Sequence, residues 1–183
     1  TKDGSWGAMG GMITSIDEFA HYMALHMAAW PPSNNPDNGP AKRSSVREMH
    51  HPWRFNNLNP DYRYTDGRNC AVVSAYCYGL GWLRDCDGKV YIAHSGGLPG
   101  FGSQWRIMPD YGIGVVAFAN RTYAGVGGIN MRVLDTIIKL AQLQPRKLPG
   151  SRILEQRKNE LVKLLPDWTS AEQSGIFAEN FFP

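Results

Sequence analysis

The most informative part of this sequence is YIAHSGGLPGFG, from Tyr91 to Gly102. A strand-like run ends in the polar pair His94-Ser95 and continues into a segment rich in glycine. Glycine has no side chain, so it allows another backbone or a ligand to approach a strand closely. The plainest interpretation is a glycine-rich connection between two strands, Gly96 to Gly102, with His94 and Ser95 merely polar at its edge.

Upstream of this segment the pattern favours a hairpin. Tyr78, Leu80 and Trp82 alternate with glycines and predict a strand. Asp87-Gly88 is a strong signal for a two-residue hairpin turn. We therefore expect residues 89–94 to run back antiparallel to the first strand.

Downstream, residues 103–108 and 113–120 predict two further strands, separated by a turn at residues 109–112. The second of these strands is almost continuously apolar, so we expect both of its faces to be covered.

Helices are expected before and after the strands. Ser15 and Glu18 form a capping-box pattern, which predicts a buried helix that runs to about Trp30 and ends at the prolines that follow. Apolar residues at helical spacing predict a helix over residues 133–141 that packs across the sheet, and a further one over residues 152–165.

Two domain-level expectations follow from these elements. Residues 1–145 would form most of one mixed α/β domain, with an antiparallel sheet flanked by helices, and residues 146–183 a helix and tail. Residues 33–68 are rich in Pro, Asn, Asp and Arg without a sustained period, so we expect an irregular excursion that covers a site or another domain.

Composition narrows the classes of function. The chain has 183 residues, is 43% hydrophobic and carries a net charge of only +3. Its basic residues are dispersed, which argues against nucleic acid as a partner. No apolar run approaches the roughly 20 residues of a membrane span, and no signal peptide is present. The compartment therefore stays open.

The cysteines and histidines indicate no metal site. Cys70, Cys77 and Cys86 allow at most one disulfide and leave one thiol free. The histidines lack carboxylate or cysteine partners at ligand spacing, so neither zinc nor any other cofactor is expected.

One catalytic interpretation treats Ser95 as the nucleophile of an α/β-hydrolase elbow. The pattern around Ser95 is close to G-x-S-x-G, but an elbow turns into a helix, and here another strand is expected. That fold also places its histidine after the nucleophile, and no histidine follows His94. Nor can His94 activate its neighbour, because adjacent side chains on a strand face opposite ways.

A second interpretation comes from family resemblance. His94-Ser95-Gly96-Gly97 resembles the K-T-G element of the penicillin-recognising serine hydrolases, in the H-S-G or H-T-G form of class C β-lactamase-like esterases and D-aminopeptidases. The resemblance extends in order from about Gly4 to Leu143. It includes the glycine-led helix start at residues 10–20, the Y-G-L-G-W strand at residues 78–82, and the last two strands from Pro99 to Asn120.

This resemblance implies an acyl-enzyme mechanism. In the family, the serine of an S-x-x-K motif attacks an acyl carbon, while the lysine and a Y-x-N tyrosine manage protons. Here the N–H of Gly97 would be one oxyanion-hole donor, and Ser95 would bind the substrate's carboxylate or carbonyl. Gly96 and Phe101 would line the cleft. His94 takes the lysine's place, so its charge would depend on pH near neutrality, which favours esters, amides or peptides over β-lactams.

The sequence contains neither S-x-x-K nor Y-x-N. We therefore expect a C-terminal part of a serine hydrolase that is inactive alone, with the missing N-terminal half as a possible partner. The alternative is a non-catalytic binding module of the same fold, with residues 33–68 as its contact surface.

Overall fold

The computed structural model describes residues 4–33, 35–64, 66–146, 148, 150–178 and 180–182. The chain divides into two compact units, residues 1–147 and residues 148–183. Each unit is described by itself below.

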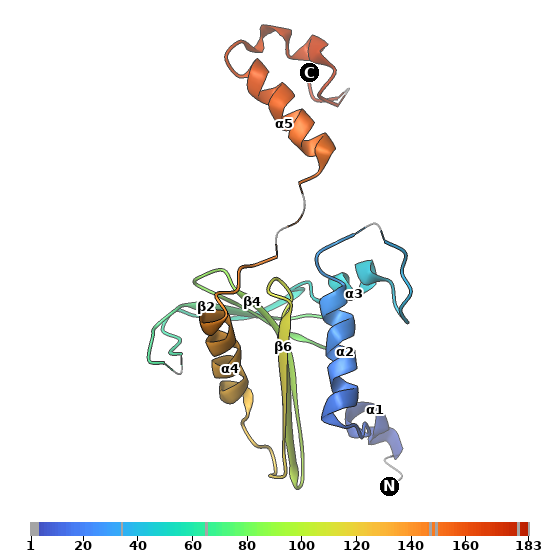
Figure 1. Ribbon diagram of the computed structural model, residues 1–183, viewed down its shortest axis with the longest axis vertical. Coiled ribbons are helices and arrows are strands. Elements are labelled where there is room, and N and C mark those ends of the chain that lie inside the picture. The colour runs from blue at the N-terminus through green and yellow to red at the C-terminus, as the bar shows by residue number, and fades with distance from the viewer. Residues whose placement is uncertain are drawn as a thin grey trace. The chain divides into compact units, whose positions relative to one another are not determined.

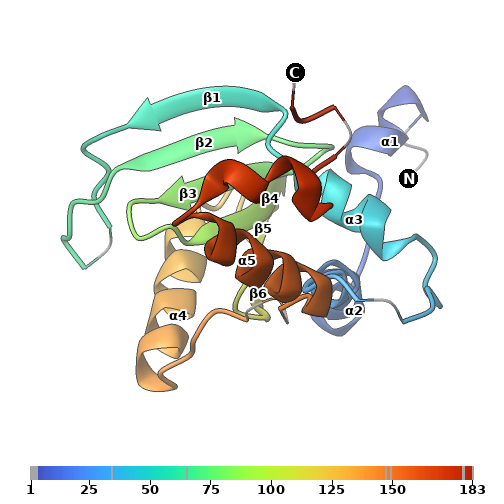
Figure 2. The ribbon, with the colours of Figure 1, turned by 90° about the horizontal axis from the view of Figure 1, so that it is seen from above.

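The first unit contains a six-stranded antiparallel sheet in which each strand pairs with the next one along the chain. Figure 2 shows the strands side by side in this order. The strands are β1 (Arg54–Asn59), β2 (Val72–Tyr76), β3 (Gly81–Asp85), β4 (Val90–Leu98), β5 (Phe101–Met108) and β6 (Ile113–Ala119). Together with its helices, this sheet confirms the expected mixed α/β fold class.

Helices α2 (Ile16–Ala28) and α4 (Gly127–Leu140) cover opposite faces of the sheet at β6 (Figure 1). Successive residues of a strand point to opposite faces, and the core divides accordingly. On the α2 face the buried cluster is Phe19, Met23, Cys77, Leu80, Ile92, Trp105 and Ile107. On the α4 face it is Tyr64, Cys70, Tyr91, Met108, Met131 and Leu134. Val116 packs against the first cluster and Val115 against the second, so β6 is covered on both faces as predicted.

The capping box at the start of α2 is confirmed. The Glu18 amide donates to Ser15 Oγ at 3.2 Å, and the Ser15 amide donates to Glu18 Oε2 at 3.1 Å. The hydrogen bond from the Ser15 backbone, followed by that from its side chain, lowers the pKa of Glu18. The amides of Ser15 and Glu18 therefore have hydrogen-bond partners at the start of the helix, where the first amides of a helix otherwise have none. A short helix, α1 (Gly7–Gly10), precedes this cap.

Residues 33–68 are not wholly irregular, which corrects our expectation. They contain helix α3 (Arg43–Met49) and the edge strand β1. The register of β1 against β2 shifts between Phe55 and Asn57. Such a bulge breaks the two-residue alternation by which a strand is recognised in a sequence.

The glycine-rich segment also differs from the expected loop. β4 runs through the glycines to Leu98, and β5 begins at Phe101, so only Pro99-Gly100 forms the turn. By contrast, Tyr78-Gly79 is not in a strand but in the turn between β2 and β3. The strand that follows it begins at Gly81.

The hairpin predicted at Asp87-Gly88 joins β3 and β4, but three residues rather than two separate Asp85 from Lys89, whose carbonyl accepts the Asp85 amide at 3.1 Å. Gly88 has φ +79°, in the left-handed region that glycine adopts without cost. A disulfide between Cys70 and Cys86 lies beside this turn, and Cys77 is the free, buried cysteine. The pairing that the sequence left open is thus settled.

The second unit begins with helix α5 (Arg152–Leu164), whose first turn is capped by Ser151. Two short 3₁₀ turns, Trp168–Ser170 and Glu172–Ser174, follow it. The aromatic residues of the tail contact one another, with ring centroids of Phe177 and Phe181 at 4.5 Å. Across the described part of both units, no helix combines the length and apolarity that a membrane crossing needs.

Candidate active site

The strand β4 loses its neighbour on one side halfway along its length. Its pairing with β3 ends where Ala93 lies opposite Gly81. Its pairing with β5 continues to Leu98, opposite Phe101. From His94 onward, the β3 side of β4 is therefore an open strand edge within the sheet.

The register indicates which amides face this edge. Leu98 and Phe101 flank the two-residue turn Pro99-Gly100, and residues that flank such a turn form a hydrogen-bonded pair. Antiparallel pairs alternate, so the N–H groups of Gly97 and Ser95 point away from β5. The intervening Gly96 carbonyl points to β5, where it accepts the Ser103 hydroxyl at 3.3 Å.

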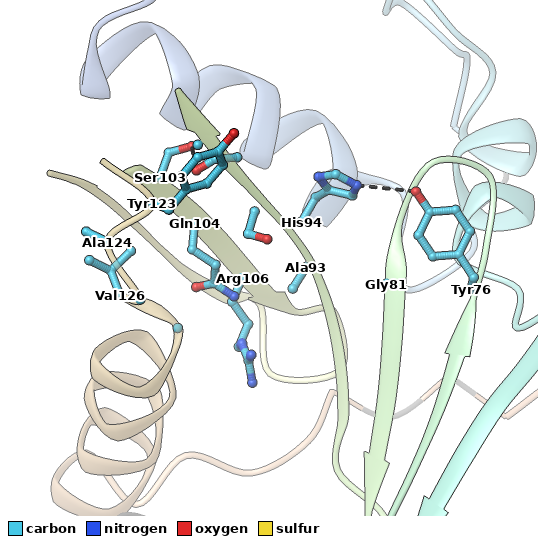
Figure 3. Close-up of a pocket in the computed structure, with 15 residues that line it drawn as sticks. Tyr76, Gly81, Ala93, His94, Ser103, Gln104, Arg106, Tyr123, Ala124 and Val126 are labelled. Carbon is cyan, nitrogen blue, oxygen red and sulfur yellow. Dashed lines mark hydrogen bonds between the residues drawn. The ribbon is translucent and has the colours of Figure 1, made fainter. Parts of the chain in front are cut away.

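A cleft with a volume of about 700 Å³ lies along this edge. His94, Ser95, Gly96 and Gly97 line one side of it, and residues 123–127 line another. Figure 3 shows Tyr123, Ala124 and Val126 approaching the strand from the segment that leads into α4. The sequence thus identified four residues of one wall.

Phe101 is not among the residues that line this cleft. It is the first residue of β5, next to the turn, and it is 65% exposed.

Tyr123 also lines the cleft, although no pattern in the sequence points to it. It has φ +49°, which is unfavourable for a bulky side chain, and its ring is 70% exposed. Its amide donates to the Phe101 carbonyl at 3.0 Å. The ring lies so close to Gly97 that any side chain at position 97 would overlap it.

Tyr76 is the second residue that the sequence did not identify. Its hydroxyl lies 3.3 Å from His94 Nε2, and both residues line the cleft (Figure 3). Tyr76 lies just before the turn that leads into the Y-G-L-G-W strand, and only the strand pairing shows that it lies near His94.

Arg106 of β5 is among the residues that line the cleft, and its guanidinium packs against the core on the α4 face. Burial lowers the pKa of its guanidinium, which lies 5.6 Å from the centre of the Tyr91 ring and donates to Met131 Sδ at 3.0 Å. Its Nε is buried and has no hydrogen-bond partner among the described residues. Beside it, the buried Gln104 accepts a hydrogen bond from Asn130.

The α/β-hydrolase alternative is overturned. Ser95 lies in the middle of β4, paired with Gln104, and the chain continues through a hairpin into β5. A nucleophile elbow requires a sharp turn from strand to helix, and the strands around an α/β-hydrolase elbow are parallel. Ser95 Oγ makes no hydrogen bond among the described residues, so no base is positioned to activate it.

In the part of the chain that the structure describes, the one group of residues close enough to share a metal ion is Cys70, Cys86 and Asp87. The two sulfur atoms are joined in the disulfide and are not thiolate ligands. His26 and His50 contact each other through Nδ1 and Nε2 at 2.8 Å, away from the cleft residues.

Comparison with known proteins agrees with this geometry. The family model described as Beta-lactamase matches residues 1–138, which include the whole sheet and most of α4. No curated protein matches the sequence significantly. Serine hydrolase chemistry on small-molecule substrates is supported at the level of the family. Because the match covers most of the chain and all of the cleft, the protein belongs to the beta-lactamase family.

Proposed function

We propose that this chain supplies the substrate-binding strand of a serine hydrolase that works through an acyl-enzyme. The Gly97 amide would donate to the oxyanion of the tetrahedral intermediate. Ser95 would hydrogen-bond a carbonyl or carboxylate of the substrate. Both roles use groups on the β4 segment that borders the cleft, and the Ser95 hydroxyl makes no hydrogen bond among the described residues.

The observation that carries this proposal is the open edge of β4. Strand edges are usually paired, covered or blunted, whereas this one borders a cleft from His94 to Gly97. An amide held in a strand keeps its direction, so it needs no reorganisation as negative charge develops. Removing one such donor typically lowers the rate by about 10²–10³.

Charge near the cleft supports the same assignment. The Arg106 guanidinium has no carboxylate partner within 4 Å among the described residues, so its charge is not neutralised locally. His94 stands where the family's element has a lysine. A histidine is a weaker and less permanent partner for a carboxylate than a lysine, so we propose esters, amides or peptides as substrates.

The nucleophile would come from outside these 183 residues, because the sequence lacks S-x-x-K. The chain alone should therefore not hydrolyse a chromogenic ester or β-lactam. We expect hydrolysis when the chain is joined to the segment of its own protein that carries S-x-x-K. Turnover by the isolated chain would contradict this division of roles.

Ser95→Ala provides the direct test in the joined protein. We expect a loss of kcat/KM without a change in thermal stability, because Ser95 is exposed and its hydroxyl has no partner within the described part of the chain. Ser74→Ala is the matched control, since Ser74 lies on β2 outside the cleft. Equal kcat/KM for both variants would remove Ser95 from the site.

The absence of S-x-x-K also favours a second candidate, a binding module without catalysis. In that case acyl compounds would bind the cleft of the chain, and the complete protein would release them unchanged. Mass spectrometry of the complete protein after exposure to a β-lactam separates the candidates, because only the first forms a covalent adduct.

A further inference from the structure

Tyr76 and His94 meet although their strands are not neighbours. Tyr76 ends β2 opposite Gly81 of β3, and Gly81 lies opposite Ala93 of β4. A Cβ on Gly81 would come within 3.3 Å of the Ala93 carbonyl oxygen. Because Gly81 has no side chain, the Tyr76 ring can reach across the end of β3 to His94 (Figure 3).

Packing does not account for the Tyr76 side chain, which is 42% exposed. Its ring lies 6.4 Å from the His94 ring, and its hydroxyl hydrogen-bonds that ring at the open edge of β4. The contact holds His94 at the point where β4 loses its β3 neighbour.

The chemistry of the pair favours one direction of the hydrogen bond. A phenol is a good donor and a poor acceptor, whereas an unprotonated imidazole nitrogen is a good acceptor. With neutral His94, the Tyr76 hydroxyl therefore donates to Nε2, and the ring proton resides on Nδ1. When His94 is protonated, Nε2–H donates to the phenol oxygen, and Nδ1 keeps its proton.

We propose that Tyr76 is a positioning residue that keeps a proton on His94 Nδ1 in both charge states. This inference rests on the proposed function. It implies that the His94 imidazole always offers an N–H donor to a substrate in the cleft. The site would then retain a donor where the family resemblance has a lysine, even when His94 is uncharged. Nδ1 makes no hydrogen bond within the described part of the chain, so this donor is available.

The test is the tautomer of His94, read from ring ¹⁵N chemical shifts of the full chain in mildly alkaline buffer, where exposed histidines are neutral. His94→Gln assigns the signal among the five histidines. In the wild type we expect the Nδ1–H form to predominate. In Tyr76→Phe we expect a shift to the Nε2–H form that free histidine prefers.

Tyr78→Phe is the matched control. Tyr78 is also exposed, but its ring contacts Trp53 at 6.0 Å and not His94. It should leave the His94 signal unchanged. The same His94 tautomer in the wild type and in Tyr76→Phe would overturn the proposal. The measurement requires no turnover, so its result is independent of whether the proposed hydrolase activity is found.

Discussion

The ring of Tyr123 lies directly over Gly97, where a Cβ would come within 2.2 Å of Tyr123 Cδ1. Position 97 therefore requires glycine because a larger residue would overlap the neighbouring wall of the cleft, and not only because a ligand must approach there. The positive φ of Tyr123 shows that the surrounding chain holds the ring in place against a backbone preference.

This contact predicts that Gly97→Ala destabilises the protein by about 1–3 kcal/mol, the usual cost of overpacking. Adding Tyr123→Ala should recover most of that loss, because it removes the overlapping ring. A double-mutant cycle from urea unfolding measures the coupling between the two positions.

Gly125→Ala serves as the control for this cycle. Gly125 lies on the same cleft wall, and a Cβ there would meet no atom within 4 Å. It should change the free energy of unfolding by less than about 0.5 kcal/mol. Additive effects of Gly97→Ala and Tyr123→Ala would show that the two residues do not contact each other in solution.

Local patterns predicted most of the fold. The Ser15–Glu18 cap, the Asp87-Gly88 turn and the apolar run of β6 each depend on residues close together in the sequence. β1 was missed because its bulge and exposure remove the alternation of a strand. The extent of β4 was missed because glycine is rare in strands, and only the contact between Gly97 and Tyr123 explains why a glycine is needed there.

The site was predictable only where it is continuous in the sequence. His94 to Gly97 form one segment and carry the family's motif. Tyr76 and Tyr123 reach that segment through strand pairing and a loop with positive φ. Neither feature leaves a local signal, so the sequence could not place these residues beside His94 or Gly97.

The contact between His26 and His50 predicts sensitivity to acid. Burial lowers the pKa of His26 to about 4, and burial together with the neighbouring His26 lowers that of His50 to about 4, from an ordinary value of 6.5. Between these values the unfolded chain binds more protons than the folded one, so stability is lost as pH falls from about 6.5 to about 4. Thermal unfolding across this range measures the loss.

His50→Gln should roughly halve the number of protons linked to unfolding in that range, because one of the two buried imidazoles is gone. His21→Gln is the control, since His21 is exposed on the same helix as His26. Burial raises the pKa of Asp110 and Asp135, which acts in the opposite direction in every variant. A pH dependence identical in all three proteins would exclude the histidine pair as its cause.

The cysteine pairing predicts a specific pattern of alkylation. The native chain should resist iodoacetamide, because Cys70 and Cys86 are bonded and burial raises the pKa of Cys77 to about 11. Unfolding without a reductant should expose one thiol, and unfolding with a reductant should expose three. Two thiols labelled in the native state would contradict the disulfide.

The same disulfide should contribute about 3 kcal/mol to stability, because it closes a loop with a sequence separation of 16 residues. Urea unfolding of Cys70→Ser with Cys86→Ser measures this contribution. An unchanged midpoint in the double variant would show that the cross-link does not restrict the unfolded chain.

Asp85 is predicted to hold the turn at which β3 ends and the chain returns into β4. Its buried carboxylate accepts the Tyr64 hydroxyl at 2.7 Å and the amides of Asp87 and Lys89 at 3.0 and 2.9 Å. Asp85→Ala would leave three donors without a partner, each worth about 1–3 kcal/mol when buried. Asp85→Asn should cost less, because its amide oxygen can still accept from the two backbone amides. In urea unfolding, both Asp85 variants should have a lower free energy of unfolding than Asp61→Ala, which removes an exposed carboxylate. Equal stability of Asp85→Ala and Asp61→Ala would contradict this role of Asp85.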